Sequence, residues 1–291
     1  MSSNLDTKEI LKKVRRIEIK TKRISDHLFS GEYHSQFKGR GMAFSEVRAY
    51  AYGDDVRAID WKVTARLNEP YIKVFEEERE LITMLMVDVS ASEGFGSKGK
   101  SKRDVMTEIS AILAFSAAGN NDKVGLILFS DHVEHYIPPG KGRKHILRII
   151  RELVEHQPKN RGTDISEALA FLNRVMRRKA IVFLLSDFWD NNYEKPMKIA
   201  AKRHDLCAIR IYDSFEKDLP KLGILPVRDA ETGQWTWVDT QSKKVRLAQR
   251  TAFAQSEKQF REITKKSGAG MINCEMHQNY TSELLNYFKT N

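Results

Sequence analysis

The sequence is poor in cysteine. Its 291 residues contain two cysteines, Cys207 and Cys274, which stand in separate strand-like segments without the spacing of metal ligands. This pattern argues against a cysteine-ligated metal site or a disulfide framework, and predicts two reduced, buried side chains in an intracellular protein.

The sequence also lacks a long apolar run. No stretch approaches the roughly 18 residues of a membrane span, and the first residues, MSSNLDTKEI, lack the apolar core of a signal peptide. There is no internal repeat and no low-complexity stretch. With 41% apolar and 30% charged residues, the chain can bury a sizeable core beneath a soluble surface. We therefore predict a cytoplasmic location without a membrane span.

From Leu81 onward, strand-like runs alternate with helical patterns, which is typical of an α/β fold with a mainly parallel sheet covered by helices on both faces. The insertion at about 214–247 interrupts this alternation, and Thr232-Gly233 between two strand-like runs predicts a surface hairpin. We expect either Trp235 or Trp237 to pack inward there. The predicted strands are 81–88, 123–130, 132–137, 179–187, 206–212 and 270–276, and the predicted helices are 103–118, 143–156, 164–177, 194–203, 248–267 and 280–289.

The first 79 residues differ from this pattern. Apolar residues at near-helical spacing predict an amphipathic helix over residues 5–29, packed on the body of the same chain. Residues 30–79 predict an irregular segment docked against the main domain of residues 80–291, with Trp61 and Ile59 as its apolar anchor. Interleaved charges predict mutual ion pairing among Asp54, Asp55, Asp60, Arg48, Arg57 and Arg66.

The most informative motif follows the buried run LITMLMV. Asp88, Ser90 and Ser92 stand at alternate positions beyond this strand, Thr163 lies in a turn that opens a helical segment, and Asp187 ends another buried strand. Such positions can meet at the carboxyl edge of a parallel sheet, where open α/β folds bind ligands. Hard oxygen ligands of this kind suit Mg²⁺ or Mn²⁺. We predict a modest-affinity metal site made by these five residues.

At these positions the sequence resembles the von Willebrand factor A-like domains, whose metal-ion-dependent adhesion site joins Asp-x-Ser-x-Ser to a later Thr and a later Asp. The resemblance implies that Ser90, Ser92 and Thr163 are direct ligands, while Asp88 and Asp187 bind the metal directly or through water. It also implies an A-like fold for residues 80–291.

A second group of residues, which precedes the metal-site motif in the sequence, indicates a particular family of A-like proteins. Gly39-x-Gly41-x-x-Phe44 and the later run Gly53-Asp54-Asp55-x-Arg57-x-Ile59-Asp60-Trp61 resemble the signature of the bacterial domain-of-unknown-function family fifty-eight, over roughly residues 28–290. Members of that family are associated with MoxR-type AAA+ ATPases. The resemblance therefore implies a protein partner of this class, with a role in folding, assembly or activation of client proteins.

The remaining chemistry leaves two alternatives to a non-enzymatic, metal-dependent interaction module. The net charge of +10, with eight Lys or Arg between Lys8 and Arg23, permits a nucleic-acid or anionic-membrane-surface binder. A strand ending in Asp also occurs in aspartyl-phosphate phosphatases, but Ser90 stands where those enzymes need a second Asp. His132 and His135 fall in a predicted edge hairpin and do not suggest a general base. We favour the interaction module, with an acidic side chain of the partner or client completing the metal coordination.

Overall fold

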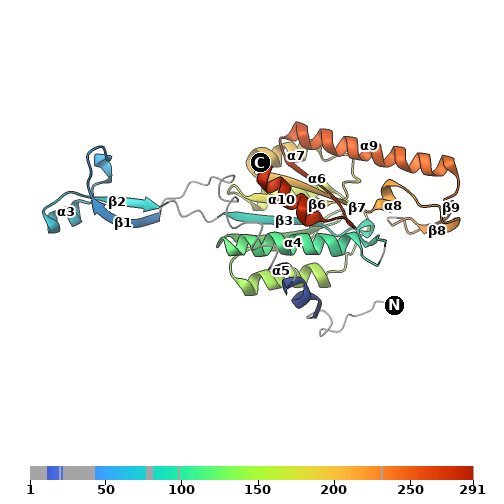
Figure 1. Ribbon diagram of the computed structural model, residues 1–291, viewed down its shortest axis with the longest axis horizontal. Coiled ribbons are helices and arrows are strands. Elements are labelled where there is room, and N and C mark those ends of the chain that lie inside the picture. The colour runs from blue at the N-terminus through green and yellow to red at the C-terminus, as the bar shows by residue number, and fades with distance from the viewer. Residues whose placement is uncertain are drawn as a thin grey trace. The chain divides into compact units, whose positions relative to one another are not determined.

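The computed structural model describes residues 12–19, 21, 43–76, 81–97, 99–230 and 232–290. The chain divides into a compact unit of residues 37–81 and a larger unit that contains the rest (Figure 1). The division lies next to the boundary predicted at residues 79 and 80. The described part of the N-terminal helix belongs to the larger unit, and docking of the small unit stays a prediction.

The larger unit is built on a six-stranded sheet with the order β10-β7-β6-β3-β4-β5. Adjacent strands are parallel except for β5, which runs antiparallel to β4 at one edge. The predicted α/β class with a mainly parallel sheet is therefore confirmed. The strands are β3 (Ile82–Asp88), β4 (Lys123–Phe129), β5 (Val133–Gly140), β6 (Ile181–Ser186), β7 (Asp205–Tyr212) and β10 (Gly270–Glu275).

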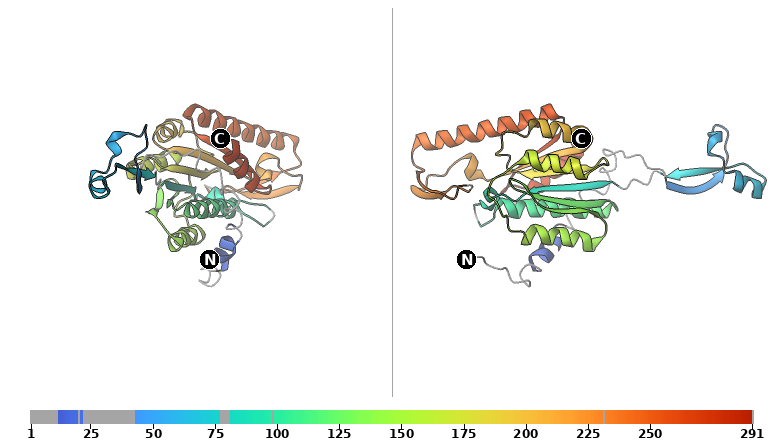
Figure 2. Two further views of the ribbon diagram at one scale, coloured as in Figure 1. Left: turned by 60° about the vertical axis from the view of Figure 1, so that its left-hand side comes forward. Right: turned by 180° about the vertical axis from the view of Figure 1, so that it is seen from behind.

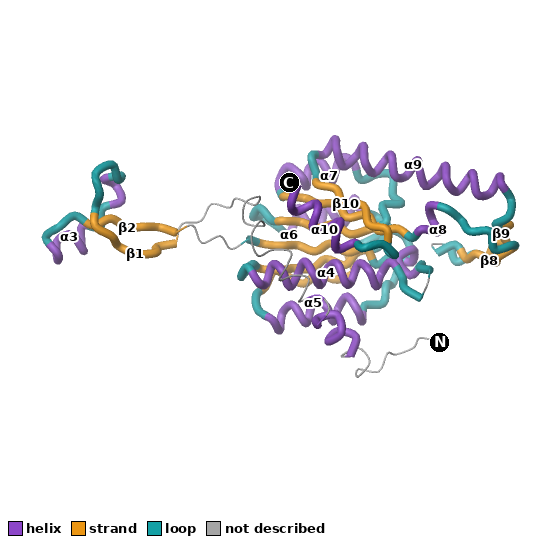
Figure 3. Tube along the Cα trace, viewed as in Figure 1, coloured by secondary structure: helices purple, strands orange, loops and turns teal. Residues whose placement is uncertain are grey.

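Helices cover both faces of this sheet (Figures 1, 2 and 3). Alternate residues of a strand point to opposite faces, so Met84 and Met86 pack in one apolar cluster with α6, α7 and α9. On the other face Phe183 meets Phe288 of α10 edge to face, and α4 and α5 lie alongside. The helices are α4 (Lys102–Gly119), α5 (Arg143–Glu155), α6 (Ile165–Val175), α7 (Glu194–Arg203), α8 (Ser214–Lys217), α9 (Lys243–Ser267) and α10 (Tyr280–Thr290).

A helical segment at residues 12–19 packs on the larger unit, as predicted. Val14 and Ile17 are buried. Lys13 pairs with Asp104 at 2.7 Å, and Glu18 accepts from Arg143. The remaining residues of the predicted helix 5–29, apart from Thr21, lie outside the described residues.

Ile17→Ala should lower the free energy of unfolding by about 2 kcal/mol, because it removes a buried aliphatic side chain that is 6% exposed. Ile19, on the same segment, is 61% exposed, so Ile19→Ala is the matched control and should change stability little. Urea unfolding followed by circular dichroism measures both. Equal effects of the two variants would show that the segment does not pack in solution.

The smaller unit is a hairpin of β1 (Ala43–Ala49) and β2 (Tyr71–Glu76), connected through η1 (Val56–Ala58) and α3 (Trp61–Leu67). The predicted ion pairing is confirmed for Asp54, which receives two hydrogen bonds from Arg48. Asp55 and Asp60 instead cap the N-termini of η1 and α3, because a carboxylate satisfies the free amides of a first turn. Lys73 is a further partner of Asp60 at 3.5 Å.

Trp61 is not part of the core of this unit. The indole is 69% exposed at the first position of α3, a short helix without buried residues, so its role in docking the unit stays a prediction. Ile72 of β2 is buried, and the other predicted anchor residue, Ile59, forms a bridge to it.

The insertion forms the expected hairpin, from β8 (Ile224–Arg228) and β9 (Trp235–Asp239). Trp235 and Trp237 are 67% and 72% exposed, so the expectation that one of them packs inward is wrong. Residues two apart on a strand share a face, and the half-buried pair Leu225 and Val238 occupies the other face. The hairpin thus presents both indoles to solvent.

Candidate metal centre

Two neighbouring strand ends bring the predicted acidic residues together. β3 ends at Asp88, and β6 ends one residue before Asp187. Because β3 and β6 are paired in parallel, their carboxyl ends lie side by side. Ser186 donates its hydroxyl to Asp88 Oδ2 at 2.7 Å, and the Ser90 amide donates to Asp88 Oδ1 at 2.9 Å. Asp88 and Asp187 are therefore held at adjacent places on the sheet edge.

The predicted hydroxyl residues lie on the loops above these strand ends. The hydroxyls of Ser90 and Ser92 are 3.1 Å apart where the chain enters η2 (Ala91–Gly94). The loop that carries Thr163 joins them through the Ala91 amide, which donates to the Arg161 carbonyl at 3.1 Å. Ser90 is buried, whereas Ser92 and Thr163 are half-buried. Ligation of an ion by the five predicted residues stays a prediction.

The structure adds a third carboxylate, Glu93, that sequence reasoning missed. Oxygens of Asp88, Glu93 and Asp187 all lie within 4.8 Å of one another, and all three residues are buried. Neither Glu93 oxygen has a hydrogen-bond partner within the part of the chain that the structure describes. The signal for Glu93 in the sequence is its position directly after Ser92, one of the predicted ligands.

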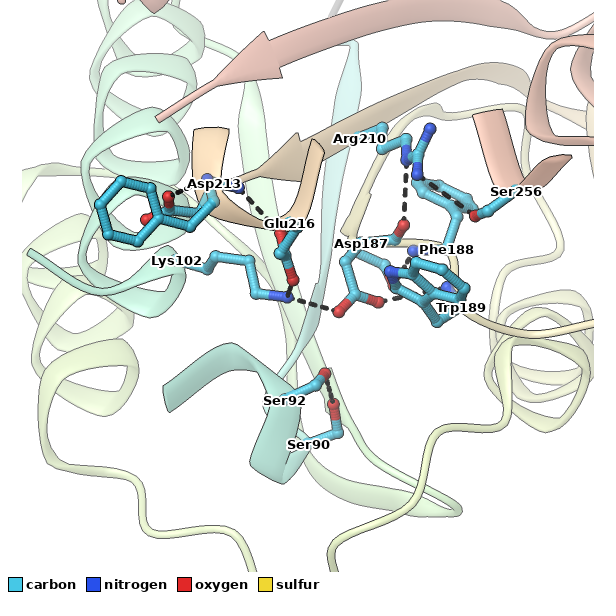
Figure 4. A network of polar contacts seen from close by, with 12 residues as sticks. Ser90, Ser92, Lys102, Asp187, Phe188, Trp189, Arg210, Asp213, Glu216 and Ser256 are labelled. Atoms are coloured by element: carbon cyan, nitrogen blue, oxygen red, sulfur yellow. Dashed lines mark hydrogen bonds and ion pairs between the residues drawn. The ribbon is translucent and has the colours of Figure 1, made fainter. Parts of the chain in front are cut away.

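A buried lysine completes the cluster (Figure 4). Lys102, the first residue of α4, donates to Asp187 Oδ2 at 2.6 Å and to Glu216 Oε1 at 2.9 Å. The chain is tightly packed just before α4, because a Cβ added at Gly96 would collide with the Lys100 carbonyl. Lys100 itself pairs with Glu108 at 2.9 Å.

Burial and mutual repulsion dominate the electrostatics. Burial, together with the neighbouring Asp187 charge, raises the pKa of Asp88 to about 7. Burial also raises the pKa of Glu93 well above its ordinary value, although Lys102 opposes the shift. For Asp187 burial acts in the same sense, but the Lys102 ammonium outweighs it and holds the pKa below the ordinary value. The positive charge of Lys102 is therefore smaller than the negative charge that Asp88, Glu93 and Asp187 carry together when all three are ionised.

The turn after Asp187 is rigidly supported. Phe188 adopts a left-handed backbone with φ of 58°, which is costly for a residue with a side chain. Its amide donates to the Ser186 hydroxyl, and its ring packs 4.5 Å from that of Phe260. Buried Arg210 donates through Nε to the Asp187 carbonyl at 3.2 Å (Figure 4). These contacts fix the Asp187 carboxylate and turn Trp189, which is 43% exposed, outward.

The two histidines considered as bases make other contacts. His132 lies 2.7 Å from Asp131, and His135, on the edge strand β5, lies 3.8 Å from Glu152. Their placement by the edge strand agrees with the sequence-based prediction.

The residues present fit a divalent cation. Three carboxylates and the two serine hydroxyls form an all-oxygen donor set, which is the type that Mg²⁺ and Mn²⁺ prefer. The unpartnered Glu93 carboxylate requires either a proton or a cation to compensate its charge. An ion would be held by Asp88, Glu93 and Asp187 with the serine hydroxyls beside them, and ligation by Thr163 stays a prediction.

Residues 46–259 match the model of a family described as "Protein of unknown function DUF58". The chain belongs to this family. It is 32% identical over 237 residues to uncharacterized proteins of Mycobacterium tuberculosis and Mycobacterium bovis, a match that covers 80% of this chain and 74% of each relative. The resemblance seen in the sequence is thus confirmed for the DUF58 family.

The chain also has partial matches among solved structures. BatB from Bacteroides thetaiotaomicron is 13% identical with a TM-score of 0.48, over 72% of this chain and 98% of that one. The SpRpn10 VWA domain is 11% identical with a TM-score of 0.39, over 72% of this chain and 95% of that one. Similarity at this level carries no information on function. Within the described ranges of the DUF58 chain, no helix is long and apolar enough to cross a bilayer.

Proposed function

We propose that this DUF58 protein is a metal-dependent protein-interaction module that acts without catalysing a reaction. The observation that supports this most directly is the buried carboxylate cluster of Asp88, Glu93 and Asp187 beneath the hydroxyls of Ser90 and Ser92. A divalent ion, Mg²⁺ or Mn²⁺, would neutralise the negative charge of the carboxylates that Lys102 does not balance. When bound, it supplies an electrophilic centre to which an oxygen of a partner can be coordinated.

The charge balance favours an acidic ligand from the partner. An ion held by the carboxylates of Asp88, Glu93 and Asp187 has the Glu216 carboxylate as a fourth negative charge nearby. Lys102 and Arg210, which are both buried, offset two of these four charges and leave an excess of two. A divalent ion neutralises this excess and remains receptive to one further anionic oxygen. The half-buried Ser92 and Thr163 lie on the side from which a partner carboxylate would approach.

Exposed aromatic residues next to the centre suit a protein partner. Trp189 follows Asp187 by two residues, and Phe95 ends η2; these side chains are 43% and 44% exposed. Aromatic side chains are enriched where interfaces derive most of their binding energy. We therefore assign the partner contact to the carboxyl edge of the sheet.

The β8–β9 hairpin extends the same surface. A Cβ added at its turn residue, Gly233, would collide with the guanidinium of Arg161, so the turn lies against the loop that carries Thr163. The Arg161 carbonyl in turn accepts from Ala91 beside the predicted ligands. Trp235 and Trp237 therefore belong to an element whose turn touches the Arg161 side chain, two residues before Thr163.

From the resemblance to the family fifty-eight signature we propose a MoxR-type AAA+ ATPase as the partner and an acidic protein as the client. We propose that they meet in the cytoplasm. The test is a pull-down with the purified ATPase from the same organism. Capture should require Mg²⁺ or Mn²⁺, fall to background in chelator and return when the ion is restored. Capture that persists unchanged in chelator would refute the metal dependence.

The same preparation tests the two alternatives. Turnover of a generic phosphate ester with Mg²⁺, lost in Asp88→Asn, would indicate a phosphatase. Binding to DNA or anionic vesicles that falls steeply with salt and ignores Mg²⁺ would indicate a surface binder that uses the basic residues.

A further inference from the structure

Lys102 places a positive charge inside the candidate metal centre. Its side chain is 1% exposed, and its ammonium holds both Asp187 and Glu216. The ammonium therefore stays charged and contacts a carboxylate oxygen of the acid cluster directly.

The lysine does not serve the whole cluster. Asp88 accepts from neutral donors, the Ser90 amide and the Ser186 hydroxyl. Both oxygens of Glu93 are unpartnered among the described residues. Lys102 thus compensates Asp187 and leaves two buried carboxylates for another cation.

We propose that Lys102 is a built-in competitor of the divalent ion at this centre, an inference that rests on the proposed function. Two cations that share the Asp187 carboxylate repel each other, so each weakens the binding of the other. Glu216, on the short helix α8, offers the ammonium a second carboxylate when the ion takes Asp187. Lys102 thereby holds the centre together without the ion and lets the ion exchange readily.

A purely structural lysine predicts the opposite result. If Lys102 served only to fasten Asp187, its removal would loosen the acid cluster and weaken ion binding. A competitor predicts that removal tightens ion binding. The sign of the change in affinity therefore separates the two roles.

The experiment is a calorimetric titration of MgCl₂, and separately MnCl₂, into the full-length wild type and Lys102→Met. Methionine keeps an unbranched apolar stem and removes the charge. Lys102→Met should bind the ion roughly tenfold more tightly than the wild type, since one repelling charge is gone. The matched control is Lys100→Met, which removes the same charge from a pair with Glu108 outside the acid cluster and should change affinity little.

A second variant, Lys102→Gln, and melting temperatures measured with and without Mg²⁺ separate a change in ion binding from a folding defect. Either variant should melt lower than the wild type without the ion and gain more in melting temperature when Mg²⁺ is added. Equal or weaker ion affinity in both variants, with binding by the wild type intact, would overturn the competitor role and leave the metal centre standing. If no protein of the set binds an ion, the metal centre, the proposed function and this inference all fail.

Discussion

Asp88→Asn is expected to abolish Mg²⁺ binding and Mg²⁺-dependent capture of the partner while leaving the fold intact. The amide removes the negative charge from the middle of the donor set but keeps an oxygen that can accept from the Ser90 amide. It also removes the charge repulsion between position 88 and Asp187, which in the wild type adds to burial in raising the pKa of Asp88. Calorimetry, pull-down and circular dichroism on one preparation measure the three properties.

Asparagine is a sharper test than alanine because Asp88 is fully buried. Alanine would leave the Ser90 amide and the Ser186 hydroxyl without their acceptor, at a cost of about 1–3 kcal/mol for each such group. A loss of capture by an alanine variant could then reflect unfolding.

The control for Asp88→Asn is Asp205→Asn. Asp205 begins β7 and pairs with Lys179 at 2.7 Å. Asp205→Asn therefore removes one negative charge, as Asp88→Asn does, but at a place outside the acid cluster. This variant should bind Mg²⁺ and the partner as the wild type does. Undiminished capture by a folded Asp88→Asn protein in chelator would place the interaction surface elsewhere.

The strands that position the centre could be predicted from sequence because they are buried on both faces. The near-continuous apolar runs before Asp88 and Asp187 are typical of central parallel strands, and β3 and β6 lie within two residues of the predicted bounds at each end. The alternation of strands and helices then fixes the edge where both acids emerge. Fold class and the principal acids thus follow from local patterns.

The charged interior of the centre could not be predicted in this way. Lys102 and Asp187 are 85 positions apart in the sequence, and a Lys at the start of a helix is ordinarily exposed. Only the placement of α4 and α8 over the strand ends brings Lys102 to Asp187 and Glu216. Pairing over such distances is a property of the tertiary fold and leaves no periodic signal.

The tryptophans were mispredicted because apolar character alone does not decide burial. Trp235 and Trp237 alternate on β9, which requires a common face, and the half-buried Leu225 and Val238 occupy the other face of the hairpin. Two exposed indoles on a surface hairpin cost solvation energy without a folding role. This is the reason to assign them to a partner.

The double variant Trp235→Ala and Trp237→Ala should weaken partner capture by roughly thirtyfold, corresponding to about 2 kcal/mol for the loss of interface aromatic residues. Its Mg²⁺ affinity and melting temperature should stay near those of the wild type, because both indoles are solvent-exposed. Affinity is measured by surface-bound titration of the partner at saturating Mg²⁺.

A control tests whether any exposed tryptophan would have the same effect. Trp61 is 69% exposed in the separate unit of residues 37–81, so Trp61→Ala should leave capture intact if the partner contacts only the edge that carries the metal centre. Loss of capture in Trp61→Ala but not in the hairpin variant would assign the aromatic contact to the small unit.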